Sequence, residues 1–278
     1  MMACRYRNIL WLLALLVLAC ASCSQSEKAE SSTDSIAEQP QAEATSSPTE
    51  DVIPDGARRL IKSYPDYIKS YKDGKLQLSD GTDIVYDSGK EKSFLEKLDN
   101  AEPVDIFAWE YNTSKSQPDY CEDPGRSRCE QLFKLMYGST SAQVQKHLVP
   151  VDWFGTKVMF SSVNGAADSL RVVCSEIKNN QQLVAYTKTA GTFLWRKVSG
   201  SERLSAHSYG IAIDIAVAKS NYWKWDHKNK SETDQIQYKN QIPLELVKIF
   251  EKHGFIWGGR WYHYDTMHFE FRPELLTK

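Results

Sequence analysis

Two short stretches in the C-terminal half of the chain alternate apolar and polar residues, which is the pattern of a β-strand with one buried face. In residues 211–216 three isoleucines alternate with two alanines and Asp214. In residues 267–271 a methionine and two phenylalanines alternate with His268 and Glu270. Both strands therefore have an apolar back and an open front that carries a carboxylate or an imidazole. This arrangement predicts a metal site built across a sheet.

Helices and further strands are expected in mixed order along the rest of the chain. The apolar spacing predicts helices over residues 93–98, 130–137, 164–178 and 243–252, with Asn164 as a cap, Pro243 in a first turn and Gly254 as a stop. Strands are expected at residues 75–78 and 83–86, as a hairpin around Asp80-Gly81, and at residues 157–161, 183–186 and 192–196.

Aromatic residues lie in two less regular parts of the sequence. Residues 219–240 are polar and aromatic, and we interpret them as a long excursion beside the site. Phe107, Trp109 and Tyr111 form either a strand packed on the core or part of a substrate rim, and core packing is the safer interpretation.

Four segments are expected along the 278 residues. Residues 1–20 have the features of a signal peptide, and residues 21–53 are rich in Ser, Thr, Ala, Glu and Pro with no hydrophobic period. This acidic composition is typical of an extended tether that does not fold. Residues 54–149 form an N-terminal section without a recognisable motif, and residues 150–278 form the expected catalytic domain.

The N-terminal segment predicts export and a lipid anchor. A positive region with Arg5 and Arg7 precedes an apolar stretch, residues 9–18, that is too short to span a bilayer comfortably. The run Val-Leu-Ala before Cys20 resembles a bacterial lipobox, in which the cysteine is lipidated, and Cys23 is a second candidate. The expected location is the bacterial cell envelope, on a membrane and facing the periplasm or the exterior. The alternative is ordinary signal cleavage and a soluble secreted protein.

Charge and cysteine content exclude two kinds of function. The formal net charge is −2, so nothing calls for binding to nucleic acid. Beyond the N-terminal segment only Cys121, Cys129 and Cys174 remain, and they form no CxxC pair, which argues against a cysteine-based zinc site. Cys121 and Cys129 bracket a turn-rich loop and either form a disulfide or stay free, whereas Cys174 lies on an apolar helical face and is expected to be a buried thiol.

Three side chains on or next to the two strands have the chemistry of zinc ligands. His207 precedes the first strand, Asp214 lies on its front, and His268 lies on the front of the second. Zinc accepts imidazole nitrogen and carboxylate oxygen, and a catalytic zinc keeps a fourth position for water. Asp265, three residues before His268, would then accept a proton from that water. The alternative is that these are hydrogen-bonded polar residues on an open sheet face, since no helical HExxH is present.

Other polar residues near these positions have weaker interpretations. Ser205 and Ser208 flank His207, but no GxSxG elbow supports a serine hydrolase. Glu270 either orients a metal ligand from behind or is an exposed strand residue. Tyr262 and His263 either contact substrate or belong to a mobile aromatic rim. Three further histidines are expected to be surface residues and not ligands: His147, His227 and His253.

Two separated blocks of this sequence resemble the M15 family of zinc peptidases. Residues 205–214 read Ser-x-His-x-x-Gly-x-Ala-x-Asp, and residues 257–269 contain Trp-Gly-Gly-x-Trp followed by Asp-x-x-His-Phe. The family includes bacterial D-alanyl-D-alanine carboxypeptidases and dipeptidases, and L-alanyl-D-glutamate endopeptidases of phage and bacterial origin. The resemblance covers about residues 160–271. It implies an α+β fold, with an antiparallel central sheet, flanking helices and a zinc site like that of Hedgehog and DD-peptidase domains.

The resemblance also assigns roles to individual residues. It implies that His207, Asp214 and His268 bind Zn²⁺, that Asp265 is the catalytic base, and that Arg196 binds substrate and stabilises the developing oxyanion. Asp265 and the Trp-Gly-Gly-x-Trp run are closer to the L-alanyl-D-glutamate endopeptidase branch, because the D-alanyl-D-alanine enzymes usually carry Glu as the base.

The sequence departs from the family pattern at two places. The Gly-Tyr-Arg-Ser run of the carboxypeptidase branch is missing, and residues 191–196 occupy its place. Arg260 stands where endopeptidase relatives often have an acid.

The sequence thus predicts a monomeric zinc metallopeptidase that hydrolyses a peptide bond in peptidoglycan stem peptides. A second hypothesis is a non-catalytic envelope lipoprotein that binds stem peptide in the same cleft. Asp265 favours the enzyme, because a binding protein needs no base.

Overall fold

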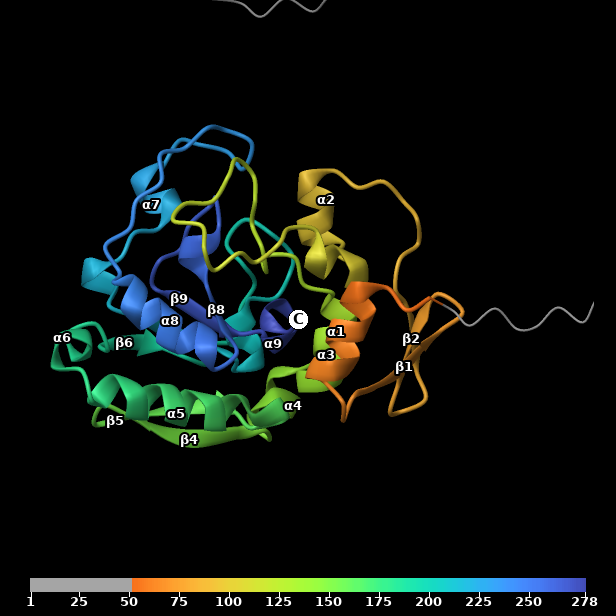
Figure 1. The fold of residues 1–278 in the computed structure, drawn as a ribbon, viewed down its shortest axis with the longest axis horizontal. Helices are drawn as coiled ribbons and strands as arrows, with labels where there is room; N and C mark the ends of the chain where they lie inside the picture. The colour runs from red at the N-terminus through yellow and green to blue at the C-terminus, as the bar shows by residue number, and fades with distance from the viewer. Residues whose placement is uncertain (1–51) are drawn as a thin grey trace, which may run out of the picture. The chain divides into compact units, whose positions relative to one another are not determined.

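The computed structural model describes residues 52–278, so the signal peptide, the lipidated cysteine and most of the tether lie outside the described residues. The described chain is an α+β fold in which helices pack against antiparallel sheets (Figure 1). Within it, no helix is both long enough and apolar enough to cross a bilayer.

The central sheet has four antiparallel strands in the order β6-β7-β9-β8. Their bounds are β6 Thr189–Gly191, β7 Ala212–Ile215, β8 Phe255–Trp257 and β9 His268–Phe271. The two strands predicted from alternation, β7 and β9, are neighbours, and Asp214 pairs directly with His268. This register places two chemically active side chains side by side, because directly opposed residues on paired strands share a face.

Helices and a hairpin cover the sheet. The helix α8 (Leu244–Lys252) packs on β8, and α5 (Ala166–Lys178) packs on both α8 and the hairpin β4–β5 (Leu148–Trp153 and Thr156–Ser161). Figure 1 shows α5 lying along this hairpin. Both long helices were expected, and each buries its apolar stripe: Leu170, Val173, Cys174 and Ile177 in α5, and Leu246, Val247 and Phe250 in α8.

The N-terminal section packs into the same core as the rest of the described chain. Its helices are α1 (Asp55–Ser63), α2 (Phe94–Asp99), α3 (Glu130–Tyr137) and α4 (Ser141–Gln145), and its sheet comprises β1 (Ile68–Lys72), β2 (Lys75–Leu78) and β3 (Asp83–Val85). The predicted hairpin is confirmed, with Leu76 opposite Ile84. One continuous apolar cluster runs from Ala57 to Leu275. The expected boundary between residues 149 and 150 falls inside β4.

Short helices complete the chain: α6 (Gln181–Val184), α7 (Trp223–Asp226) and α9 (Pro273–Leu276). The strand predicted at residues 183–186 is wrong, because α6 occupies this stretch and the Asn180 side chain accepts hydrogen bonds from the backbone of Gln182 and Leu183. The strand predicted at residues 192–196 is also wrong. This segment is irregular, and only Lys197, just beyond it, forms an isolated bridge, with Leu204.

Several local predictions need correction. Asn164 does not cap α5; its amide donates to the Ser63 carbonyl, and Gly165 takes the cap position. Tyr111 is buried in the core as expected, yet it lies in no strand. The front of β9 is buried rather than open, since His268 is 7% and Glu270 0% exposed. Cys121 and Cys129 are free thiols, so the disulfide alternative does not form, and Cys174 is a buried thiol as predicted.

Candidate metal centre

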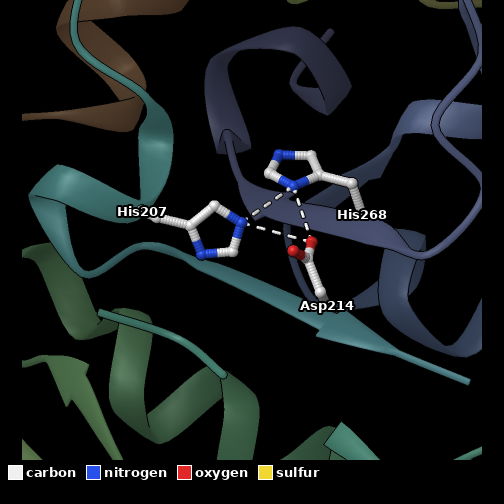
Figure 2. A group of neighbouring side chains, drawn as sticks. All are labelled: His207, Asp214 and His268. Atoms are coloured by element: carbon white, nitrogen blue, oxygen red, sulfur yellow. Dashed lines mark hydrogen bonds and ion pairs between the residues drawn. The ribbon is translucent and has the colours of Figure 1, made fainter. Parts of the chain in front are cut away.

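Two imidazoles and one carboxylate converge on a single point between the short helix η3 (Ala206–Tyr209), β7 and β9. The His207 Nε2 and His268 Nδ1 atoms lie 3.2 Å apart, and Asp214 Oδ1 lies 3.2 Å from the first and 3.0 Å from the second (Figure 2). His268 lies 54 positions from Asp214 and 61 positions from His207 in the sequence, so the fold brings it to the other two. The three residues predicted to bind one metal ion therefore lie close enough together to contact a single ion.

Local backbone structure fixes the position of each of the three side chains. His207 lies in the short helix η3 (Ala206–Tyr209), whose first turn is held by Ser205 Oγ accepting from the His207 backbone N–H. Gly210 then turns the chain into β7 with a φ of 66°, and a Cβ at this position would collide with Leu148. Glycine is thus favoured at position 210 by the left-handed backbone, and a Cβ there would also displace the end of the Leu148 side chain.

Hydrogen bonds behind the two imidazoles fix which nitrogen atoms are free. The far nitrogen of His207, Nδ1, donates to the Thr192 carbonyl at 2.7 Å. The far nitrogen of His268, Nε2, lies 3.1 Å from Glu270 Oε2 and donates to this carboxylate. Each neutral ring then presents a lone pair to the common point. Such backing partners are the usual means by which proteins orient metal-binding histidines.

The donor set and its dimensions fit zinc. Ligands held at about 2.0–2.1 Å in a tetrahedron lie roughly 3.3 Å from each other. The three separations of 3.0–3.2 Å approach this value without any movement of the backbone. Two imidazoles and one carboxylate also leave a fourth position on the cleft side, which is the composition of a catalytic rather than a structural site.

The electrostatics of the three groups show how strongly the point attracts positive charge. Burial opposes ionisation of Asp214, but the adjacent His207 and His268 hold its pKa well below the ordinary value. Burial also disfavours a charged His268, but hydrogen bonds to Asp214 and Glu270 outweigh it and raise the pKa of His268 to about 10. A proton or a metal cation is therefore strongly favoured between these side chains.

Asp265 lies next to this centre with an unsatisfied carboxylate oxygen. Its Oδ1 atom is buried and has no hydrogen-bond partner in the described chain. Burial and the nearby Asp214 raise the pKa of Asp265 to about 7. Gly258 allows this placement, since its carbonyl accepts from the Asp265 N–H at 3.0 Å and a Cβ at Gly258 would meet the Asp265 carbonyl.

Glu270 stands behind His268 in a network of charged groups. It accepts from His268, from Arg128 at 3.3 Å and from Arg272 at 2.7 Å, and Arg272 also donates to Glu274 at 2.5 Å. Burial raises the pKa of Glu270, but these cations more than offset it and hold the pKa well below its ordinary value. The alternative of an exposed strand residue is wrong, and Glu270 orients His268.

The centre opens into a cleft of about 240 Å³. Arg196 lines this cleft and is exposed, with its guanidinium turned only to the neighbouring Lys197 carbonyl at 3.4 Å. Arg196 lowers the pKa of Asp265, which places its positive charge near that carboxylate. Arg196, which was predicted to bind substrate, thus lies at the rim of this cleft and not against the three converging side chains.

A second group of metal-type residues borders the same cleft, but an arginine already occupies it. Asp123, Glu232 and His263 come together, and Arg126 donates to Asp123 at 2.6 Å and to Glu232 at 2.9 and 3.0 Å. Asp123 also accepts from His263 Nδ1 at 2.6 Å. The interpretation of His263 as part of a mobile rim is wrong, because its side chain is buried and clamped by Asp123.

The weaker candidates have structural roles. Ser208 Oγ accepts from the Arg196 N–H and donates to the Arg196 carbonyl, so it holds the cleft loop and does not act as a nucleophile. Arg260 is buried against Glu251, with its Nε 2.9 Å from Oε1, and it lies outside the cleft lining. His147 is exposed, while His227 and His253 bond to the Gln237 carbonyl and to Glu176.

Sequence reasoning missed the residues that the N-terminal section contributes to the cleft. Arg126 and Arg128 lie in the loop before α3 and line the cleft, together with Arg203. Only the density of charge in the segment 121–130 could have indicated this, and spacing alone does not distinguish such a loop from a solvated surface.

The comparisons with known proteins agree with this geometry. A family model of M15 peptidases, described as D-alanyl-D-alanine carboxypeptidase, matches residues 199–271. Residues 199–271 thus form a segment that is similar to M15 peptidases. The segment contains His207, Asp214, Asp265 and His268, whereas Arg196 and the loop before α3 lie outside it.

A curated relative of the M15 segment is the peptidoglycan L-alanyl-D-glutamate endopeptidase CwlK of Bacillus subtilis (strain 168), which is 39% identical over 71 residues. The match covers 25% of this chain and 40% of the relative, so the chain spans less than half the length of that protein. No solved structure matches the chain.

Proposed function

We propose that the chain is a zinc-dependent peptidase that hydrolyses a peptide bond in peptidoglycan stem peptides. The observation that carries this proposal is the convergence of His207, Asp214 and His268 within 3.2 Å, with the lone pairs of both imidazoles directed inward. Beside them lies Asp265, a carboxylate that no protein donor satisfies at Oδ1. The match of the M15 segment supports the same reaction class.

Each of the four residues at the centre has its own proposed role in the reaction. His207, Asp214 and His268 would hold zinc, which supplies a Lewis acid for the scissile carbonyl and for water. Asp265 takes the proton from the attacking water and returns it to the leaving amine. Its raised pKa suits both halves of this transfer, because a group that ionises near neutral pH can accept and release a proton with little cost.

Arg196 is proposed to stabilise the oxyanion that forms during attack. Its guanidinium has no carboxylate partner in the described chain, and it lies at the cleft rim on the side of Asp265. A cationic donor that meets its anion only when substrate is bound lowers the barrier more than one already neutralised in the free enzyme.

We favour the bond between L-alanine and D-glutamate as the target. The curated relative named for this activity shares 39% identity over the matched stretch, and Asp265 follows the pattern of that branch. The departure at Arg260 does not weaken this choice, because Arg260 is bound to Glu251 away from the cleft.

The site is proposed to act at the bacterial envelope, tethered through a lipid on Cys20. The support is the lipobox-like run before Cys20 and the acidic stretch rich in Ser, Thr, Ala, Glu and Pro after it. Metabolic labelling with a fatty acid tests this. Label should be lost in Cys20→Ala and retained in Cys23→Ala, and the reverse pattern would move the anchor to Cys23.

The function is tested by incubating the purified chain with a defined muropeptide and identifying the products by mass spectrometry. Hydrolysis should stop when a chelator removes the metal and return when zinc is added back. A product pair split between L-alanine and D-glutamate supports the endopeptidase, and release of a terminal D-alanine supports the carboxypeptidase. Binding of intact muropeptide without hydrolysis, at any metal content, would favour the non-catalytic alternative.

A further inference from the structure

Three arginines from outside the metal ligands line one wall of the cleft. Arg126 and Arg128 come from the loop before α3, and Arg203 precedes η3 by a few residues. Their side chains are 9%, 8% and 9% exposed, so all three guanidinium groups are nearly removed from water. A buried charge is costly unless it is paired. The partners of each arginine therefore show whether any of the three guanidinium groups remains available to bind a ligand.

Arg126 is fully paired within the protein. It binds Asp123 and forms a two-pronged contact with Glu232, and both carboxylates lie within 3.0 Å. Arg128 is less well satisfied, since its one carboxylate, Glu270, lies 3.3 Å away and is shared with Arg272 and His268.

Arg203 is the least compensated of the three. Its Nη1 donates to two backbone carbonyls, those of Leu98 at 3.2 Å and Arg126 at 3.4 Å. Its one carboxylate neighbour, Asp99, is 3.8 Å away and 48% exposed. The buried Nε atom has no hydrogen-bond partner among the described residues.

The environment of Arg203 is also unfavourable for its charge. Burial, together with the charges of Arg126 and Arg128, lowers the pKa of Arg203 to about 9. An anion bound in the cleft beside the Arg203 guanidinium would relieve this repulsion, and the planar guanidinium is suited to a carboxylate.

We propose that Arg203, assisted by Arg128, forms a subsite that binds a carboxylate of the substrate in the cleft. This proposal rests on the proposed function, since it adds the substrate group that the cleft wall recognises. It also gives the N-terminal section a role: the loop before α3 supplies part of the substrate-binding wall. Arg196 at the rim remains separate and acts on the oxyanion.

A stem peptide carries the group that this subsite requires. L-alanyl-γ-D-glutamyl-L-lysine has two carboxylates, on the glutamate α-carbon and at the C-terminus. Replacing either by a carboxamide changes the charge with almost no change in shape. Three peptides therefore suffice: the free acid and the two single carboxamides.

The test measures binding of the three peptides to the full chain carrying Asp265→Asn, so that the ligand stays intact during calorimetry. One of the carboxamides should bind about 10- to 100-fold more weakly than the free acid, as expected for loss of a charge-assisted hydrogen bond. Adding Arg203→Gln should bring this ratio close to one. Arg203→Lys, which keeps the charge but not the planar fork, should retain part of the ratio.

The ratio within one protein is insensitive to loss of folded material, because both peptides meet the same preparation. Arg171→Gln, on the exposed surface of α5, is the control and should keep the full ratio. An equal ratio with and without Arg203, or no binding of any peptide, would overturn the subsite. Hydrolysis by the unmodified chain is followed in parallel. Binding that depends on Arg203 without hydrolysis would leave the subsite standing and refute the peptidase.

Discussion

The Nε2 atom of His207 faces the Nδ1 atom of His268 at 3.2 Å, and among residues 52–278 no other group donates a hydrogen bond to either atom. The other ring nitrogen of His207 donates a hydrogen bond to the Thr192 carbonyl, and that of His268 donates to the Glu270 carboxylate. Two lone pairs at this separation, with the Asp214 carboxylate beside them, favour a proton or a metal cation between them.

The first prediction is therefore that the chain binds one zinc ion and that His207→Ala abolishes this binding. Metal content after dialysis, measured by atomic absorption, should be one ion per chain for the wild type and near zero for the variant. The exposed His147 is the matched control. Full zinc content in His207→Ala, or its loss in His147→Ala, would contradict the assignment of the ligands.

The second prediction concerns the residue behind His268. Glu270→Gln should weaken zinc binding by about 10- to 100-fold, because the neutral amide holds the ring less firmly and makes the nitrogen less basic. Competition with a zinc chelator measures this change.

Glu274→Gln is the control for that variant. Glu274 pairs with the same Arg272 at 2.5 Å and is equally buried, but it does not touch His268. It should lower the free energy of unfolding and leave zinc affinity unchanged. Equal zinc affinities in the two variants would show that Glu270 has only a structural role.

The third prediction is the pH dependence of hydrolysis. Asp265 must be ionised to accept a proton, and burial together with Asp214 raises its pKa to about 7, whereas bound zinc would lower it again. Activity should thus be present above this pKa and be lost as the pH falls through it. We expect the acid limb of kcat/KM between about 4, the ordinary aspartate value, and 7. A profile flat down to pH 3 would exclude Asp265 as the base.

The fourth prediction concerns the stability of the cleft wall. Burial opposes the charge of Asp123, but Arg126 and His263 outweigh it and lower the pKa of Asp123 to about 2. Because the folded pKa lies below the unfolded value, this carboxylate stabilises the fold above about pH 4 and ceases to do so as the pH falls toward 2. Asp123→Asn should reduce the free energy of unfolding by about 2–4 kcal/mol at pH 7.

Urea denaturation at pH 7 and at pH 3 measures the effect of Asp123→Asn. The difference between variant and wild type should be smaller at pH 3, where part of the wild-type stabilisation is already lost. Asp119→Asn, in the same loop but paired with Lys115 in solvent, should change stability by less than about 1 kcal/mol. Equal losses at the two pH values would show that the charge of Asp123 is not the cause.

The meeting of His207, Asp214 and His268 could be expected from the sequence because two of the three lie in strands with a regular pattern. Alternation identified β7 and β9 and placed Asp214 and His268 on their polar faces, whereas His207 was singled out because it directly precedes the first strand. Pairing of these two strands then followed from the antiparallel register. The long helices α5 and α8 were predicted for the same reason, since each has a regular apolar stripe.

The cleft wall could not be predicted because its parts are distant in sequence and have no period. Arg126 meets Glu232 across 106 positions, and Asp123 meets His263 across 140. Likewise residues 192–196 contain a short apolar run typical of a strand, but they pair with no strand in the described part of the chain. The Thr192 carbonyl instead accepts from His207, and Ser208 holds the backbone of Arg196. The conformation of these segments is determined by tertiary contacts and not by their local sequence pattern.

The most direct test of a zinc peptidase with a separate base is one measurement on Asp265→Ala: its zinc content and its turnover of a defined muropeptide in the same preparation. The variant should hold one zinc per chain, because Asp265 is not among the three converging groups, and kcat should fall by about 10²- to 10⁴-fold. Turnover at the wild-type rate with zinc bound would contradict the role of Asp265 and, with it, the proposed mechanism.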